Sequence, residues 1–137
     1  MIRGIRHFFQ RCIRGFDDTV VWDLDQHILG LILPRLRLYR EIGQEFSWPG
    51  PGSIFDIDWE VFQGLTDAEQ EDLNERSQEE WDRMLGKMIR AIELQIEHGG
   101  MFLVEEADGS FKESLILKAE YEEGWDLFIK WFHALWT

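Results

Sequence analysis

The chain has 137 residues, which fits a single domain (1–137) large enough to bury a hydrophobic core. Hydrophobic residues make up 45% of it and aromatic residues 14%, which excludes an intrinsically disordered chain, and the single cysteine, Cys12, excludes a disulfide framework. The net charge of −13 is uneven, because residues 1–40 carry +3 and residues 41–137 carry −16. This charge repels nucleic acid and attracts basic partners, so we expect no direct nucleic-acid binding.

Residues 2–16 are predicted to form an amphipathic helix. Its apolar positions follow three- and four-residue spacing: Ile2, Ile5, Phe9, Cys12, Ile13 and Phe16. The pattern favours a helix whose arginines contact acidic neighbours, with Cys12 as inert packing. The alternative is a basic arm for a membrane surface or a partner. No uninterrupted apolar core occurs here, so we expect no signal peptide.

Residues 22–42 are predicted to form the central helix of the fold. One broad apolar face holds Leu24, Ile28, Leu31, Ile32, Leu38, Tyr39 and Ile42, and a second stripe holds Leu29, Leu33 and Leu36. A helix that is apolar on two sides is expected to be covered by other helices. Its uninterrupted run of apolar residues is too short to span a membrane. Pro34 should bend its axis, because proline removes one backbone hydrogen bond.

Residues 45–65 break the helical period and are predicted to form a long aromatic loop. The stretch from Ser47 to Ser53 contains two prolines and two glycines and is expected to be neither helix nor central strand. Packing of its aromatic side chains is the simpler use of such a loop. If part of it is exposed, its aromatic and acidic residues are the candidate partner-binding site: Trp48, Phe55, Asp56, Asp58 and Trp59.

Further helices complete an all-α fold, a compact bundle of about four main helices. Thr66 and Glu69 form a capping box that opens a short acidic helix, and Ser77 and Glu80 form a second one opening a helix to about His98. The second helix buries Trp81, Met84, Leu85, Met88, Ile92 and Ile96. Residues 101–111 form either a small hairpin or a loop, and the last helix runs from about 112 to 136.

Catalytic patterns are weak, and we expect a protein that is not an enzyme and needs no cofactor. The chain has neither a phosphate-binding glycine loop nor an inward Glu-x-x-His pair. Carboxylates on the last two helices resemble the magnesium-binding sets of all-α nucleotide pyrophosphatases: Glu79, Asp82, Glu93, Glu120, Glu123 and Asp126. Because these positions lie away from the apolar faces, we expect them to diverge into water.

Four stretches together resemble uncharacterised small acidic proteins of tailed bacteriophages. They read WDLD at 22–25, LPRL at 33–36, WDRMLGKMI at 81–89 and GWDLFIKWF at 124–132. The likeness covers most of the helices but neither residues 1–16 nor residues 45–65. It implies a viral origin and the cytoplasm of an infected bacterium, and it transfers no functional residue.

These observations favour a phage-encoded interaction protein that binds and inhibits a host protein of defence or nucleic-acid processing through its acidic surface. Two alternatives stay open at this point. One is a sponge for a nucleotide second messenger, with Arg35, Arg37 and Arg40 holding phosphates. The other is the Mg²⁺-dependent pyrophosphatase. Apolar stripes on nearly every helix also leave room for a homodimer, and no membrane is expected as a partner.

Overall fold

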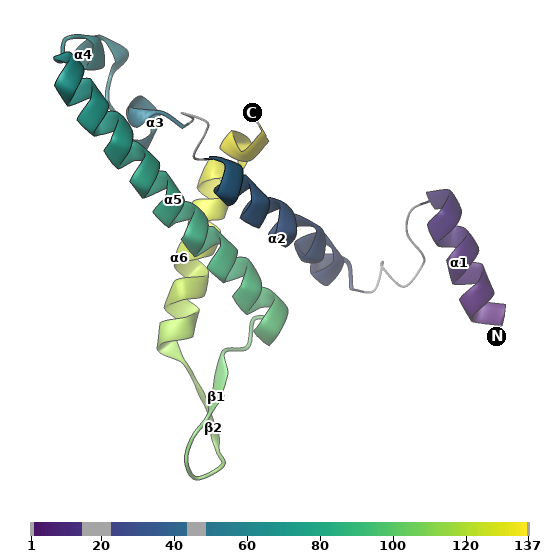
Figure 1. Cartoon of the computed structure of the whole chain (residues 1–137). Helices are drawn as coiled ribbons and strands as arrows, with labels where there is room; N and C mark the ends of the chain where they lie inside the picture. Colours follow the sequence, from purple (N-terminus) through teal and green to yellow (C-terminus); the bar gives the residue numbers. More distant parts are fainter. Residues whose placement is uncertain (1, 15–22, 44–48, 137) are drawn as a thin grey trace. The chain divides into compact units, whose positions relative to one another are not determined.

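The computed structural model describes residues 2–14, 23–43 and 49–136, and the chain in these ranges is mostly helical (Figure 1). It divides into two compact units, Met1–Ile32 and Leu33–Thr137, and the boundary falls within helix α2. Its helices are α1 (Ile2–Arg14), α2 (Leu24–Ile42), α3 (Pro51–Phe55), α4 (Trp59–Gln63), α5 (Asp67–His98), α6 (Leu115–Trp131) and the 3₁₀ turn η3 (Phe132–Trp136). Its strands are β1 (Leu103–Glu105) and β2 (Phe111–Glu113). The predicted helical class is therefore confirmed.

The first unit contains α1 and the N-terminal half of α2. The apolar side chains of α1 that the structure describes are exposed: Ile5, Phe8, Phe9 and Ile13. Cys12 is exposed as well, so the expectation that this thiol is packing material is wrong. Helix α2 begins directly after Asp23, whose carbonyl accepts a hydrogen bond from the His27 N–H at 2.9 Å. Among the residues of this unit whose side chains the structure describes, Leu29 is buried.

Helix α2 buries its narrow stripe but leaves most of its broad apolar face exposed, so the prediction that other helices cover both sides is wrong for the broad face. Leu29 and Leu36 are buried, and Leu33 is half-buried. Five of the seven residues of the broad face are exposed, whereas Ile32 and Tyr39 are half-buried; the exposed ones are Leu24, Ile28, Leu31, Leu38 and Ile42. Side-chain pattern shows which faces are apolar, but it cannot show which face finds a neighbour.

The core of the second unit lies between α5 and α6, which pack against each other (Figure 1). Met88, Ile92 and Leu94 of α5 are completely buried. Trp81 of α5 meets Trp131 of α6 edge to face, with ring centroids 5.5 Å apart. The buried Trp131 therefore closes the core between α5 and α6.

Helix α5 is one continuous helix of 32 residues, so the predicted break at Ser77 is wrong. The Ser77 hydroxyl donates to the carbonyl of Asn74 at 2.8 Å, within the same helix, and its side chain is fully buried. A serine in mid-helix can satisfy its hydroxyl this way without capping anything. The first capping box is confirmed: Thr66 accepts from the Glu69 N–H, and Glu69 accepts from the Thr66 N–H. The helix ends at Gly99, as predicted, in the left-handed conformation.

The segment after α5 is a hairpin, which resolves the choice between hairpin and loop. Strands β1 and β2 pair antiparallel, with Val104 opposite Lys112, and the turn holds Gly109 at a φ of 80°. The last helix begins later than predicted, at Leu115, because Lys112 is in β2 and Ser114 caps the helix. The Ser114 hydroxyl accepts from the Leu117 N–H at 3.3 Å.

Candidate protein-interaction surface

Two short helices replace the predicted aromatic loop over residues 51–63. Proline at the first helical position loses no hydrogen bond, since that N–H has no partner inside a helix, so α3 can begin at Pro51. Asp56 ends α3 in the left-handed conformation, with a φ of 54°, and its N–H donates to the carbonyl of Gly52. Asp58 directly precedes α4 in an extended conformation. Both aspartates are exposed at the turn between these helices.

Negative charge is concentrated where α4 leads into α5. Residues 49–75 contain eight Asp and Glu and no Lys, Arg or His. All eight carboxylates are exposed: Asp56, Asp58, Glu60, Asp67, Glu69, Glu71, Asp72 and Glu75. Asp67 and Glu69 also suit the positive N-terminus of α5. We call these eight carboxylates, together with the side chains of Trp59 and Val61, the acidic end of α5.

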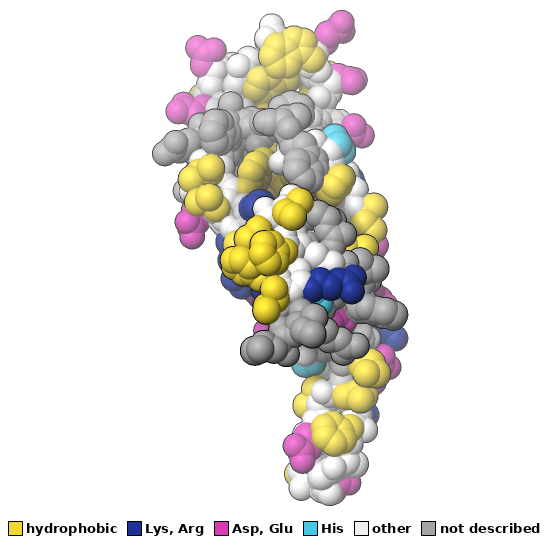
Figure 2. Space-filling view, turned by 90° about the vertical axis from the view of Figure 1, so that its right-hand side faces the viewer, with side chains coloured by type: hydrophobic (Ala, Val, Ile, Leu, Met, Phe, Trp, Pro, Cys, Tyr) yellow, Lys and Arg dark blue, Asp and Glu magenta, His cyan; other side chains and the backbone are white. Residues whose placement is uncertain are grey.

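Two large apolar side chains lie exposed within the acidic end of α5. Trp59 is 69% exposed and Val61 is 59% exposed. The Trp59 ring stacks on Phe62 of the same helix, with centroids 5.8 Å apart. Figure 2 shows hydrophobic surface flanked by acidic side chains at the top, the height at which α4 lies in Figure 1. The acidic end of α5 therefore presents an exposed aromatic side chain surrounded by negatively charged ones, which suits binding to a basic protein.

Not every predicted partner-binding residue takes part in this surface. Asp56, Asp58 and Trp59 come together as exposed neighbours, whereas Phe55 is half-buried beneath the guanidinium of Arg76, 5.5 Å from the ring centre. Trp48 lies outside the described residues. Sequence reasoning missed Val61 and the carboxylates of the first α5 turns. The absence of any cation between positions 49 and 75 was the signal that could have identified them.

The carboxylate of Glu69 is held in its charged form by its own capping box. The backbone N–H and the hydroxyl of Thr66 both hydrogen-bond to it and lower the pKa of Glu69. A carboxylate that accepts such bonds keeps its negative charge to lower pH than a free one. The capping box therefore also sustains the charge of the acidic end of α5.

Two of the three arginines considered for phosphate binding are paired with carboxylates of α5. Arg40 donates from Nε and Nη2 to the two oxygens of Asp82, at 2.8 Å each. Gly86 leaves room for this guanidinium, because a Cβ there would lie 3.0 Å from Arg40 Nη1. Arg37 donates to Glu93 at 2.6 Å, and Arg35 is exposed. These bonds fasten the C-terminal half of α2 to α5 and do not form a common phosphate site.

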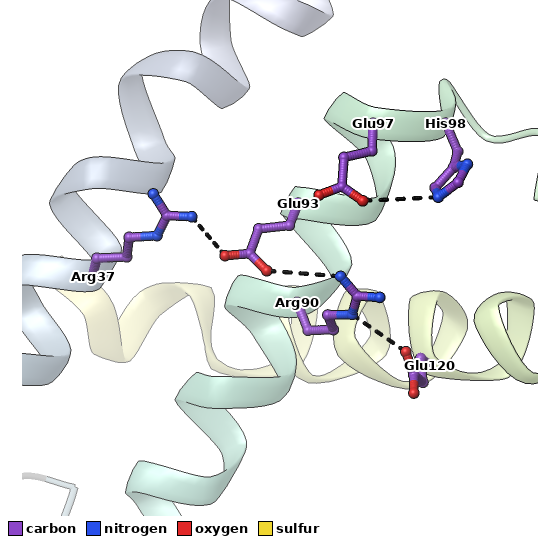
Figure 3. A network of polar contacts seen from close by, with 6 residues as sticks. All are labelled: Arg37, Arg90, Glu93, Glu97, His98 and Glu120. Atoms are coloured by element: carbon purple, nitrogen blue, oxygen red, sulfur yellow. Dashed lines mark hydrogen bonds and ion pairs between the residues drawn. The ribbon is translucent and has the colours of Figure 1, made fainter.

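Glu93 is the centre of a polar network that links three helices (Figure 3). Besides Arg37 of α2 it pairs with Arg90 of α5 at 3.9 Å, and Arg90 in turn contacts Glu120 of α6 at 3.3 Å. A second ion pair between α5 and α6 joins Lys87 and Glu123. The expectation that these acids diverge into water is therefore wrong for four of the six, Asp82, Glu93, Glu120 and Glu123. Within the ranges that the structure describes, no group of three or more His, Cys, Asp or Glu could hold a metal ion.

Replacing Asp82 by asparagine should lower the stability of the folded chain at neutral pH but not in strong acid. The hydrogen bonds from Arg40 lower the pKa of Asp82 below its ordinary value of 3.8. The carboxylate therefore contributes stability above that value, and the contribution is lost as the pH falls through the lowered pKa. Both side chains are more than a third exposed, so solvent screening should limit the effect to less than about 1 kcal/mol.

Urea unfolding of both proteins from pH 7 down to pH 2 measures this difference. The two stability curves should lie apart at neutral pH and converge below the ordinary Asp82 pKa. If the difference in the free energy of unfolding were the same at every pH, the charge of Asp82 would not be its cause.

No protein-family model, no curated protein and no solved structure matches this chain. No helix in the described ranges combines the length and the apolar character needed to cross a membrane.

Proposed function

We propose that this is a non-enzymatic, phage-encoded protein that binds and inhibits a basic host protein through the acidic end of α5. The observation that carries the proposal is the exposure of Trp59 and Val61 among eight carboxylates with no cation in residues 49–75. Aromatic anchors supply much of the binding energy at protein interfaces, and surrounding charge steers the partner and selects it. The partner that fits is a host enzyme of defence or nucleic-acid processing, whose groove is positively charged.

The distribution of cations along α5 supports this choice of surface. Every Lys and Arg of α5 lies at or beyond position 76, and all four pair with carboxylates: Arg76, Arg83, Lys87 and Arg90. The middle of α5 is therefore close to balanced in charge and serves the packing of α2 and α6. In the acidic end, Asp72 pairs with Arg76 at 3.7 Å, but residues 49–75 themselves supply no cation. Spaced carboxylates on a helix present charge much as phosphates do to a groove that has evolved for nucleic acid.

The remaining parts of the proposal rest on the sequence. A viral origin and action in the cytoplasm of an infected bacterium come from the resemblance to phage proteins. The finer architecture, a compact bundle of about four main helices with α2 kinked at Pro34, also remains a proposal, as does a single domain over residues 1–137.

Affinity capture from a lysate of infected bacteria, using the full chain, tests the proposed function. Two variants remove parts of the surface: Trp59→Ala, and the triple variant Asp56→Asn, Asp58→Asn, Glu60→Gln. The matched control neutralises three exposed acids elsewhere, Glu105, Glu106 and Glu122, each to Gln. A captured basic protein should bind each surface variant at least about tenfold more weakly and the control unchanged, since one lost anchor or a few lost charges cost about 1–2 kcal/mol.

The salt dependence and the effect on the partner complete this test. Binding should weaken steeply as salt is raised, because exposed charges are screened over about 10 Å at 0.1 M salt. The captured enzyme should also lose activity in the presence of the wild-type chain. Salt-independent binding, equal loss in the control variant, or an undiminished partner activity would each count against the proposal.

A further inference from the structure

Strand β1 of the hairpin presents an open backbone edge. The Glu106 N–H donates to the carbonyl of Ser110 at 2.7 Å, so the backbone groups of Glu106 are directed toward β2. In an antiparallel pair the direction of bonding alternates along each strand, and the N–H and carbonyl groups of Leu103 and Glu105 therefore point to the outer side. Because the sheet has two strands in the described part of the chain, these groups meet no third strand there.

Contacts at the base of the hairpin hold β1 in place. The Ser114 N–H donates to the carbonyl of Phe102 at 2.7 Å, and the Phe102 side chain is buried. The Phe102 ring centre lies 4.9 Å from that of Tyr121 in α6 and 5.9 Å from that of His98 in α5. The strand is therefore already extended and anchored to both helices, so a binding partner would not have to order it.

The side chains along β1 change from apolar to acidic. Leu103 is 47% exposed and Val104 is 46% exposed. Glu105 and Glu106 follow them, and neither carboxylate forms an ion pair or a side-chain hydrogen bond within the described ranges. Figure 2 shows hydrophobic and acidic side chains next to one another at its lower end, the height at which the hairpin lies in Figure 1. Strand β1 contains no Pro, Lys or Arg, residues that commonly protect an edge strand from further pairing.

We propose that β1 binds an extended segment of a partner protein as a third, antiparallel strand of this sheet. Antiparallel pairing is slightly more stable per residue than parallel pairing, and side chains that lie opposite each other interact. The segment should therefore place basic residues opposite Glu106 and Glu105 and apolar residues opposite Val104 and Leu103. Read from its N-terminal end, the segment has two basic residues followed by two apolar ones.

Charge favours this occupant over a second copy of the chain. A twofold pair of β1 strands would supply no cation for Glu105 or Glu106, because β1 and its flanking residues contain none. A basic segment supplies the opposite charge, and addition of a strand to an open sheet edge is a common mode of peptide recognition. The hairpin follows the C-terminal end of α5, away from the acidic end of α5 (Figure 1). The inference therefore uses a different surface from the proposed function and does not depend on it.

An NMR titration of the full chain with the blocked synthetic peptide Thr-Lys-Arg-Val-Ile-Thr tests the site. The amide protons of Leu103 and Glu105 should shift downfield and exchange more slowly with solvent, because both N–H groups gain a hydrogen-bond partner. A peptide with two glutamates in place of Lys and Arg should bind at least about tenfold more weakly, since it puts like charges opposite Glu105 and Glu106.

Methylation of the peptide backbone separates strand addition from attraction between side chains. In the proposed register the Arg and Ile amides of the peptide point toward β1, and the Lys and Val amides point away from it. Methylating the first two nitrogens should abolish binding, whereas methylating the other two should leave it unchanged. The two peptides carry the same side chains and the same number of methyl groups, so each is the matched control for the other.

Charge reversal on the protein tests the acidic side of the site. Glu105→Lys should raise the Kd of the peptide at least about tenfold, and Glu122→Lys, which makes the same change in net charge at an exposed position of α6, should leave it unchanged. Unshifted Leu103 and Glu105 amides, equal effects of the two methylation patterns, or equal weakening by the two variants would overturn the proposal. Shifts of the same amides with protein concentration alone would also overturn it, because they would assign the edge to a second copy.

Discussion

Replacing Gly124 by alanine should destabilise the protein by about 3 kcal/mol, the upper end of what overpacking costs in a core. A Cβ at position 124 would lie 2.3 Å from the carbonyl oxygen of Lys87 and 2.5 Å from the Cβ of Ala91. Because one of these atoms belongs to the backbone of α5, no side-chain rotation can relieve the clash. The two helices must separate instead, and the apolar contacts around Phe128 and Met88 loosen with them.

The same substitution at Gly30 is the matched control, and its effect should have the opposite sign. No heavy atom lies within 4 Å of a Cβ built on Gly30, which is in α2. Alanine in an open helical position stabilises by about 0.5–1 kcal/mol relative to glycine. Urea unfolding of the three proteins at neutral pH measures both effects, provided that the slope of the transition stays the same. If both variants shift stability in the same direction, the close crossing of α5 and α6 is not the cause.

The sequence predicts secondary structure correctly where the residues that start or end an element lie within three or four positions of one another. The capping box of Thr66 and Glu69 and the helix end before Gly99 act over three or four residues, and the structure has both where the sequence predicts them. The Asp108–Gly109 turn was one of two alternatives for its segment, and the structure has it. Ser77 shows the limit of such reasoning. The same motif letters occur there, but the surrounding residues favour helix on both sides, so the serine bonds within α5 instead of starting a new helix.

Tertiary packing was harder to predict, because the sequence pattern shows which helix faces are apolar but not which of them packs against another helix. Both stripes of α2 are apolar in the sequence, and only the arginines of its C-terminal half, paired with Asp82 and Glu93, show which side meets α5. The same holds for the predicted site. Phe55 and Trp59 are both aromatic residues of one short segment, yet one is half-buried under Arg76 and the other is exposed.

Two isoleucines of α5 allow the difference between predicted and observed burial to be measured as a difference in stability. Ile92 and Ile96 lie one helical turn apart, and the spacing of apolar residues predicts both as core. The structure buries Ile92 completely and leaves Ile96 38% exposed. Ile96 lies in the last turn of α5, just before the helix ends at Gly99. The two positions therefore have the same residue, the same helix and the same predicted face, but different surroundings.

Ile92→Ala should destabilise the folded chain by about 3 kcal/mol, because it removes buried methyl and methylene groups and leaves a cavity that the surrounding helices can fill only in part. Ile96→Ala should cost less than about 1 kcal/mol, since water already reaches that side chain and can occupy the space it leaves. Thermal and urea unfolding of both variants measure the difference. Equal costs would mean that the α5 core extends a full turn further than the structure shows, and a larger cost at Ile96 would place the centre of the core at the hairpin end of the helix.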